Sequence, residues 1–568
     1  MPKKPNMKKN KERTRAHEST NAIERMYITM RHLFNRGFYK PMGVSGETLR
    51  QSLLQLRPEI YGAIALEKAE LHGLIYILAR LPEGIEQCRY INLTSDEGYK
   101  DSHFTPIIPP KRRRNCYRID EEQMNIEITR GRSDIYDILT HLTFMFIESG
   151  KICRRVLHEE TRQTTRDWQK LSTLVRKKKL SLLEREEAII HTASILGRTF
   201  QEVSAVYKVL ATKKQPERFL HIIYWLGKLA IEEVLDGNRR TITFSPVLRE
   251  RLGHHIHGER WAHHIKKTLK QYALLERPLH IISANMHSVM NSVYAVRVLK
   301  EAFREADSPL VIYQTLSKTG NGHLREKVKA FAEKNGMLTI KDMWGTGMDV
   351  QIFDTAKIDF SDTGFSFNAE LPEAEKPVLL VMDYAFGEQA YETVDELLKP
   401  YKEGKTKFHL NVNSVSIMGK AGILEGKKGD IMIPNAHIFE GTADNYPFKN
   451  ELSKADFKGS GLRVYEGAMF TVLGTSLQNR DVLEFLHKST WNTIGIEMEG
   501  AHYQKAIQSA SRIRNSISEY VKVRYAYYAS DNPLETGSTL ASGGLGITGV
   551  KPTYLITKKI LEQIFNSQ

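Results

Sequence analysis

The chain has 568 residues, which is too long for one hydrophobic core and indicates two or three domains. It is 41% hydrophobic and 26% charged, as in an ordinary globular protein, and no apolar run approaches the roughly 20 residues that a membrane span needs. Three scattered cysteines and a basic start without an apolar segment after it predict a cytoplasmic protein without structural disulfides or a secretory signal.

The net charge of +15 is concentrated in part in three basic runs, residues 3–15, 111–114 and 176–179. Blocks of like charge are commonly solvated loops, helix faces or disordered tails. No nucleic-acid motif with interleaved aromatic residues accompanies these runs, so we expect no nucleic-acid partner. Strongly salt-dependent RNA binding would support the opposite interpretation.

The N-terminal half is predicted to be helical. Residues 1–19 are polar and lysine-rich, so we expect a disordered basic tail. Residues 20–275 show apolar side chains at helical spacing and predict an all-α domain. The clearest candidate helices span residues 60–81, 135–156, 180–196 and 219–235. The pattern leaves open whether this domain serves oligomer contact, substrate gating or regulation.

Residues 254–264 are unusually rich in histidine. The cluster consists of His254, His255, His257, His263 and His264. Imidazoles at this density can bind zinc or another transition metal. No carboxylate or cysteine completes a recognised ligand spacing, which favours a surface or interface cluster on a helix. We therefore expect neither a metal nor a cofactor.

In residues 278–568 apolar runs alternate with helical segments, which predicts a mixed, largely parallel sheet. The predicted strands include residues 279–284, 310–313, 350–353, 365–368 and 378–382, and the predicted helices include residues 289–302 and 324–334. The glycine-rich residues 419–422 are expected to form a turn after a further strand.

Two acidic residues follow predicted strands near the C-terminus. Glu499 stands where an apolar strand enters a helix, and Asp531 stands where an aromatic strand stops at a Ser-Asp-Asn-Pro turn. In open α/β sheets the carboxyl ends of the strands are where ligands bind. Acids also serve as helix N-caps and turn residues, so a purely structural role stays open.

These motifs occur in an order that resembles the nucleoside phosphorylase and nucleosidase superfamily. They are Gly-Lys-Ala-Gly at 419–422, Ile-Glu-Met-Glu at 496–499 and Ser-Asp-Asn-Pro-Leu at 530–534. The resemblance covers residues 278–568 and is strongest to the catalytic domain of AMP nucleosidases. It implies a three-layer α/β fold, a purine nucleotide or nucleoside as substrate, and a homo-oligomer between a dimer and a hexamer.

The resemblance also implies roles for individual residues. Asp531 would be the proton donor to the purine, and Glu499 would accept hydrogen bonds from the ribose hydroxyls. Met498 would pack on the ribose, supported by Glu497. The remaining residues predicted to bind substrate are Gly419, Lys420, Ala421, Gly422, Phe470, Ser530 and His287.

The sequence departs from the family pattern in two places. Residues 416–418 contain no arginine, which phosphorylases of this kind use to hold phosphate, so hydrolysis is favoured over phosphorolysis. No acid follows the first strand; His287 is the candidate base there, because imidazole titrates near neutrality, and a plain loop histidine is the alternative.

The predicted function is hydrolysis of the N-glycosidic bond of a purine nucleotide or nucleoside, with AMP as the first guess, to free base and ribose or ribose phosphate. One alternative is a phosphate-dependent purine nucleoside phosphorylase. The other is a non-catalytic, nucleotide-binding regulatory protein.

Overall fold

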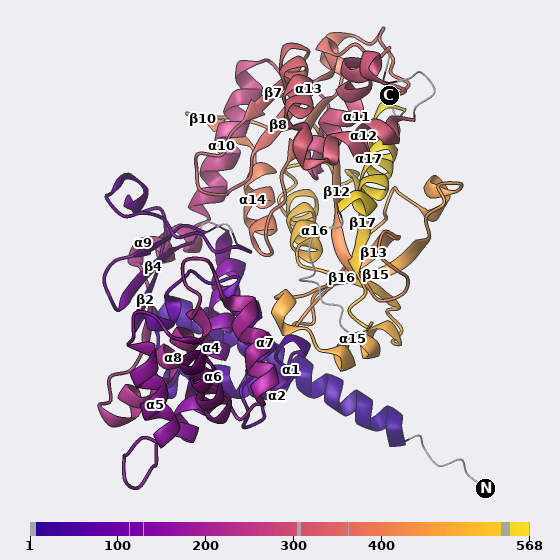
Figure 1. Ribbon diagram of the computed structural model, residues 1–568. Coiled ribbons are helices and arrows are strands. Elements are labelled where there is room, and N and C mark those ends of the chain that lie inside the picture. The colour runs from indigo at the N-terminus through magenta and orange to yellow at the C-terminus, as the bar shows by residue number, and fades with distance from the viewer. Residues whose placement is uncertain are drawn as a thin grey trace, which may run out of the picture. The chain divides into compact units, whose positions relative to one another are not determined.

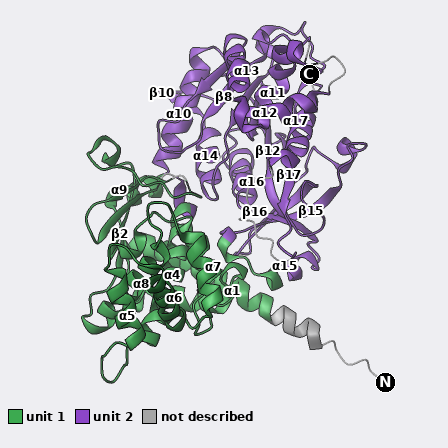
Figure 2. Cartoon of the chain, in the orientation of Figure 1, with its two compact units in different colours: residues 1–129, 134–254, 476–482 green, residues 130–133, 255–475, 483–568 purple. Residues whose placement is uncertain are grey.

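The computed structural model describes residues 7–112, 114–128, 130–303, 308–361, 363–535 and 546–566, with side chains from Arg15 onward (Figure 1). The chain forms two compact units (Figure 2). Unit 1 comprises residues 1–129, 134–254 and 476–482, and unit 2 comprises residues 130–133, 255–475 and 483–568. Each unit therefore contains a short segment from the other half of the sequence.

Unit 1 combines helices with a small sheet. Its helices are α1 (Met7–Arg36), α2 (Val44–Leu56), α3 (Leu71–Leu78), α4 (Gly131–Val156), α5 (Arg166–Val175), α6 (Leu182–Leu196), α7 (Phe200–Leu210), α8 (Arg218–Leu235) and α9 (Pro246–Gly253). The first residues of α4 belong to unit 2. The strands are β1 (Phe38–Tyr39), β2 (Tyr90–Thr94), β3 (Cys116–Arg118), β4 (Gln123–Glu127) and β5 (Thr241–Phe244), in the order β1-β5-β2-β4-β3.

The prediction of an all-α N-terminal domain is therefore wrong. Its five strands are two to five residues long and pair across long stretches of sequence, so they leave little local periodicity to detect. The predicted helices 135–156, 180–196 and 219–235 are confirmed within a few residues by α4, α6 and α8.

The predicted long helix over residues 60–81 is also wrong. The chain forms a short 3₁₀ turn, Glu59–Tyr61, and α3 begins only at Leu71. The Glu70 carboxylate accepts hydrogen bonds from the backbone N–H groups of Ala63 and His72, at 2.7 and 3.1 Å. It thereby holds the intervening turn and caps α3. The composition of residues 60–81 favours a helix and gives no indication of this arrangement.

Most of the basic N-terminal segment, predicted to be disordered, is helical. Helix α1 begins at Met7, so the prediction is wrong for residues 7–19, while residues 1–6 lie outside the described part of the chain. From Ala16 onward one face of α1 is buried, and Ala22 and Ile23 are at most 1% exposed. Packing of this face stabilises a helix whose composition alone favours disorder.

Unit 2 is built on a mixed ten-stranded sheet. Its strands run β14-β13-β15-β16-β12-β6-β9-β8-β7, and β17 pairs with both β12 and β13. They are β6 (Leu279–Ser283), β7 (Met337–Ile340), β8 (Val350–Asp354), β9 (Val378–Met382), β12 (Val412–Ile423), β13 (Ile431–Phe439), β14 (Asn445–Pro447), β15 (Val464–Thr471), β16 (Thr493–Glu497) and β17 (Lys522–Asp531). A separate hairpin consists of β10 (Tyr401–Glu403) and β11 (Thr406–Phe408).

Helices cover both faces of this sheet. They are α10 (Ile256–Gln271), α11 (Met286–Leu299), α12 (Pro309–Ser317), α13 (Gly322–Lys334), α14 (Gln389–Leu397), α16 (Gly500–Gln508) and α17 (Val550–Phe565), while α15 (Arg480–His487) is shared between the units. One core joins the sheet to α10, α14 and α16, and a second joins it to α11, α13 and α17. No helix among the described residues is long and apolar enough to cross a membrane.

The prediction of a mixed sheet is confirmed, and most of its paired residues are in parallel register. Parallel pairing joins β12 to β6 and β17, β6 to β9, and β15 to β13 and β16. The remaining strand pairs are antiparallel: β7–β8, β8–β9, β12–β16, β13–β14 and β13–β17. The link from β7 to β8 is too short for the crossover that parallel neighbours require.

Two predicted strands are absent. Residues 310–313 lie in α12, because Pro309 occupies the first helical turn, where proline is well tolerated. Residues 365–368 form no strand, and their apolar side chains pack in an aromatic group instead. The rings of Phe365 and Phe565 lie 5.5 Å apart, and those of Phe360 and Phe367 lie 4.1 Å apart.

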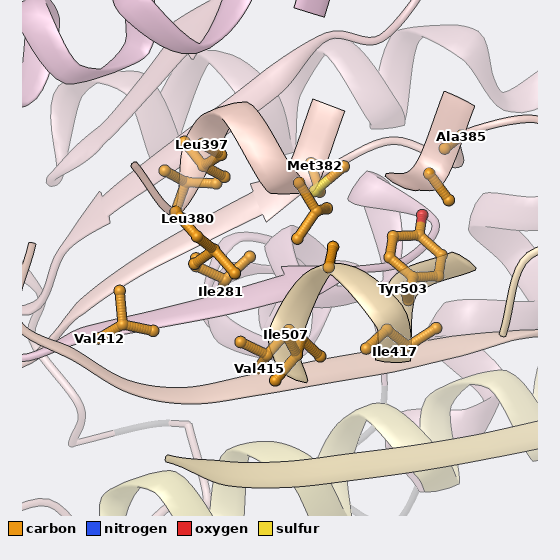
Figure 3. Packing of buried hydrophobic residues seen from close by; sticks show 14 of the residues in the cluster. Ile281, Leu380, Met382, Ala385, Leu397, Val412, Val415, Ile417, Tyr503 and Ile507 are labelled. Carbon is orange, nitrogen blue, oxygen red and sulfur yellow. The ribbon is translucent and has the colours of Figure 1, made fainter. Parts of the chain in front are cut away.

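The centre of the sheet carries one hydrophobic core. Ile281 of β6, Leu380 of β9 and Val415 of β12 pack towards Leu397 of α14 and Ile507 of α16 (Figure 3). None of these five side chains is more than 1% exposed. This packing holds the strands whose ends form the site described below.

We expect Leu380→Ala to lower the free energy of unfolding by about 2–5 kcal/mol, because it removes fully buried methyl groups and leaves a cavity. Urea denaturation of the full chain measures the change. Met343, 70% exposed, provides the control: Met343→Ala should change the value by about 0.5 kcal/mol or less. Equal effects of the two substitutions would contradict this account of the core.

Candidate active site

Strand β12 brings the two acidic motifs together. Gly422 lies opposite Asp531 of the parallel strand β17 and opposite Ile496 of the antiparallel strand β16. The carboxyl ends of both acid-bearing strands therefore meet at the end of β12. The predicted turn at residues 419–422 is wrong, because β12 continues through it to Ile423, with a register shift between Ala421 and Gly422.

Asp531 is the last residue of β17 and is only 6% exposed. Its Oδ1 atom hydrogen-bonds with the Ser530 hydroxyl, which also lies 3.1 Å from the Ala421 carbonyl oxygen. Within the described residues, the buried Oδ2 atom has no hydrogen-bond partner. Burial raises the pKa of Asp531 above its ordinary value, against the lowering effects of Ser530 and the Lys420 and Lys428 charges. Burial thus shifts Asp531 towards its protonated form, and one of its oxygens is available to a ligand.

Asp531 does not hold the turn that follows it. The Asn532 side chain does so: its Oδ1 atom accepts from the Leu534 N–H at 2.9 Å, and its amide donates to the Gly426 carbonyl at 3.1 Å. Asn532, and not Asp531, therefore has the structural role of the turn residue.

Glu499 occupies the N-cap position of α16, yet its side chain makes no capping hydrogen bond. Instead its Oε1 atom accepts from the Gly387 N–H at 3.0 Å. Burial and the nearby Glu497 carboxylate raise the pKa of Glu499 to about 8, against the lowering effects of the Gly387 and Met498 backbone and the Lys420 charge. The half-buried carboxyl is therefore turned away from its own helix.

Lys420 connects the two acids. Its side chain is exposed on β12, and its charge lowers the pKa of both Asp531 and Glu499. An ammonium group that acts on both carboxyls lies within electrostatic range of each. Asp531, Glu499 and Lys420 therefore lie on β12 or at the ends of the strands paired with it.

Glu497 has the supporting position. It accepts hydrogen bonds from the Thr471 hydroxyl and from the Glu499 and Gly500 N–H groups, so it closes the N-terminus of α16. The buried His437 Nδ1 atom lies 3.5 Å from its Oε1 atom. Burial would raise the pKa of Glu497, but His437, Thr471 and the Gly500 N–H hold it below its ordinary value.

Residues 130–133 contact the Gly387 turn, a contact that the sequence analysis did not predict. Gly387 has φ +56°, and a Cβ atom there would lie 2.3 Å from the Ser133 hydroxyl. That hydroxyl accepts from the Glu388 N–H at 2.8 Å, and Arg132 forms an ion pair with Glu388 at 3.2 Å. Residues 130–133 precede this turn by about 250 positions in the chain, so no local sequence pattern could have predicted the contact.

Two further residues near the site were missed. The Tyr384 hydroxyl donates to the Met418 carbonyl, and its ring would lie 3.2 Å from a Cβ atom at Gly419, which explains the glycine. Asp383 follows β9 and acts on His287 as an opposite charge. Both residues follow β9 directly, a position where ligands commonly bind in α/β sheets, and that signal was available in the sequence.

The other predicted residues lie near neighbouring strand ends. Met498 is half-buried between β16 and α16, and Phe470 is a buried residue of β15 opposite Ile496. His287 is exposed in the first turn of α11, with its ring 6.5 Å from that of Tyr554. In the described part of the chain neither a hydrogen bond nor an ion pair joins His287 to Asp531 or Glu499.

The histidine cluster is dispersed. His257 Nδ1 lies 2.6 Å from the Trp344 carbonyl oxygen, and the His263 and His264 rings contact Tyr401 and Trp344. No group of three or more His, Cys, Asp or Glu side chains within the described ranges is placed to hold a metal ion.

We expect Gly500→Ala to lower the free energy of unfolding by about 1–3 kcal/mol, because the new Cβ atom would lie 2.3 Å from the buried His437 ring. Gly474→Ala is the matched control, since nothing lies within 4 Å of a Cβ atom there. Denaturant titration of both variants tests the packing of Glu497 and His437 under α16. An unchanged stability in Gly500→Ala would show that this packing is wrong.

Solved nucleosidase structures match part of the chain at low similarity. The Campylobacter jejuni 5'-methylthioadenosine/S-adenosyl homocysteine nucleosidase is 10% identical, with 51% of this chain and 99% of that chain covered and a TM-score of 0.31. A futalosine hydrolase mutant of Helicobacter pylori is 12% identical, with 51% and 98% covered and a TM-score of 0.30. Likeness at this level says nothing about the reaction of this chain.

A comparison with curated proteins finds no match. One family model, described as "Family of unknown function (DUF6909)", matches residues 47–303 and 310–566. This match covers most of the chain and extends over both units. The protein therefore belongs to the DUF6909 family.

Proposed function

We propose that unit 2 hydrolyses the N-glycosidic bond of a purine nucleotide or nucleoside, with AMP as the first candidate substrate. The observation that carries the proposal is the state of Asp531, a buried carboxyl with a raised pKa and one oxygen unpartnered among the described residues. It lies at the end of β12, where β16, the strand that leads to Glu499, also ends. A carboxyl whose pKa is raised by burial is suited to general acid catalysis.

In the proposed reaction Asp531 gives its proton to N7 of the purine. The bond between C1′ and N9 breaks and its electron pair moves into the purine ring, so the base leaves neutral and positive charge develops on the ribose. Glu499, in its ionised form, accepts hydrogen bonds from the ribose hydroxyls and stabilises this positive charge. Water then adds to C1′ and loses a proton, for which His287, beside Asp383, is the candidate acceptor.

Lys420 gives the site a cation that suits a nucleotide. Its exposed ammonium group can hold a phosphate oxygen as a point charge. The same charge keeps the pKa values of Asp531 and Glu499 from rising further.

We also propose that the protein is a homo-oligomer, between a dimer and a hexamer, and that it is located in the cytoplasm.

Phosphorolysis is the second candidate, and one observation favours it. Strand β12 carries no arginine at residues 416–418, but Arg132 lies beside the Gly387 turn that contacts Glu499. An arginine there could hold inorganic phosphate. Its ion pair with Glu388 offsets part of its charge, so hydrolysis remains the leading proposal.

We expect the protein to release adenine from AMP without added phosphate, and Asp531→Asn to lower the rate by about 10²–10⁴-fold, because the amide cannot donate the carboxyl proton. The assay quantifies free purine by chromatography after incubation with AMP, adenosine, inosine or methylthioadenosine, with and without phosphate. Glu425→Gln, at an exposed position after β12, should retain full activity.

The outcomes separate the candidates. Release that depends on phosphate would move the assignment to a phosphorylase. Nucleotide binding without release of base from any substrate would refute an enzyme and favour the regulatory protein. Equal rates in Asp531→Asn and Glu425→Gln would refute the role of Asp531.

We expect Lys420→Met to move the pH profile of kcat/KM to higher pH. Activity that requires protonated Asp531 falls as the pH rises through its pKa, and removal of the Lys420 charge raises that pKa. The Lys420 charge also lowers the pKa of Glu499, so its removal raises that pKa as well. Activity that requires ionised Glu499 therefore begins at a higher pH, and the rising and falling limbs of the pH profile both move upward. Rates between pH 5 and pH 9 test this, with Lys405→Met as the control; a downward shift would contradict it.

A further inference from the structure

Unit 2 contains a cavity of about 450 Å³ that the proposed reaction does not use. It is lined by residues 427–430, 461–463, 547–548 and 551–552, together with Gln314 of α12. The segments lie far apart in the sequence, so the cavity is a product of the fold. Its volume falls within the range of about 300–1,000 Å³ that is typical of small-molecule sites.

Four cations surround this cavity, which we call the cation pocket: Lys427, Lys428, Arg463 and Lys551. All four are exposed, and within the described residues none forms an ion pair with a carboxylate. The acid in the lining, Asp430, is 3% exposed, and its Oδ2 atom accepts from the Lys427 N–H at 2.9 Å. The positive charge of the pocket is thus largely uncompensated, which favours an anionic ligand.

The sheet holds two of the segments side by side. Strands β13 and β15 are parallel and begin with the paired residues Ile431 and Val464, so the residues before them share one edge. The Ile431 N–H donates to the Arg463 carbonyl at 2.9 Å. The Gly429 N–H donates to the Ala529 carbonyl at 2.9 Å, which ties the lysine-bearing loop to β17. Backbone hydrogen bonds therefore fix the positions from which the cations extend.

The start of α17 completes the pocket. A Cβ atom at Gly461 would lie 3.5 Å from the Lys551 ammonium group, and one at Gly429 would lie 3.6 Å from the Thr548 methyl group. The N-cap residue, Gly549, offers no side-chain hydrogen bond to the first turn of this 16-residue helix. The helix start adds partial positive charge to that of the four side chains.

We propose that the cation pocket binds a small phosphate-bearing anion. Four cations, the Thr548 hydroxyl and the Gln314 amide supply more donors than one carboxylate needs and suit the several oxygens of a phosphate or diphosphate. Free pyrophosphate and the phosphates of a nucleotide share this chemistry.

The pocket also has a connection to the proposed active site. Lys428 is one of the charges that lower the pKa of Asp531. An anion that neutralises Lys428 would raise this pKa, so its occupancy would alter the pH dependence of base release. This consequence rests on the proposed function, whereas the binding itself does not.

The test is calorimetric titration of the full chain with pyrophosphate, without any substrate of the proposed reaction. We expect saturable binding, with the Kd raised about tenfold or more in Arg463→Gln and in Lys551→Gln, because each loses a charge-assisted contact. Lys405→Gln, at the exposed turn of the β10–β11 hairpin, removes the same charge elsewhere and should bind as the unaltered protein does.

Hydrogen exchange locates the ligand and separates its sources. Pyrophosphate should protect residues 427–430, 461–463 and 547–552. Tighter binding of ATP, with competition by pyrophosphate, identifies a nucleotide, and equal or weaker binding of ATP identifies a free phosphate compound. No binding, the same affinity in all variants, protection elsewhere, or binding of single-stranded RNA alone would overturn the proposal. Retained base release with no pyrophosphate binding would refute this proposal and leave the proposed function standing.

Discussion

The pairing of β12 with β16 and β17 is the constraint on which the candidate site depends. Gly422 has a neighbour in each strand, Asp531 on one side and Ile496 on the other, so the two acid-bearing strands end together. A side chain at Gly495, opposite Ile423, would meet the Gly422 carbonyl at 2.7 Å, so this part of the sheet has no room for a larger residue. The close backbone approach, more than any side-chain contact, places the acids.

Three carboxyl groups in this small volume have different tasks because their surroundings differ. Glu497 is saturated with hydrogen bonds, has a lowered pKa, and holds the start of α16. The half-buried Glu499 and the buried Asp531 have few hydrogen-bond donors around them, and their removal from water raises their pKa values. An acid whose pKa is raised in the folded state lowers the free energy of unfolding at neutral pH. A residue with a purely structural role would be expected to stabilise the fold. This contrast is what favours a chemical role for the pair.

Long elements with strong local patterns were predictable. Helices α4, α6 and α8, strands β6, β8 and β9, and the positions of Glu499 and Asp531 at strand ends follow from periodicity and turn residues. The short strands of unit 1 were not, because two to five residues carry too little pattern. The glycine-rich residues 419–422 were expected to turn, yet strand pairing on both sides keeps them extended.

The sequence by itself determined which residues can do chemistry: a strand followed by Glu499, a strand ending at Asp531, and a lysine between glycines in β12. Only the tertiary structure decided which of these residues lie at neighbouring strand ends, because sheet order depends on pairing between distant segments. It brought Ser133 to the Gly387 turn and gathered the four cations of the cation pocket from three segments. Burial and the hydrogen bonds of each acid, which together set its pKa, are likewise properties of packing that no local pattern records.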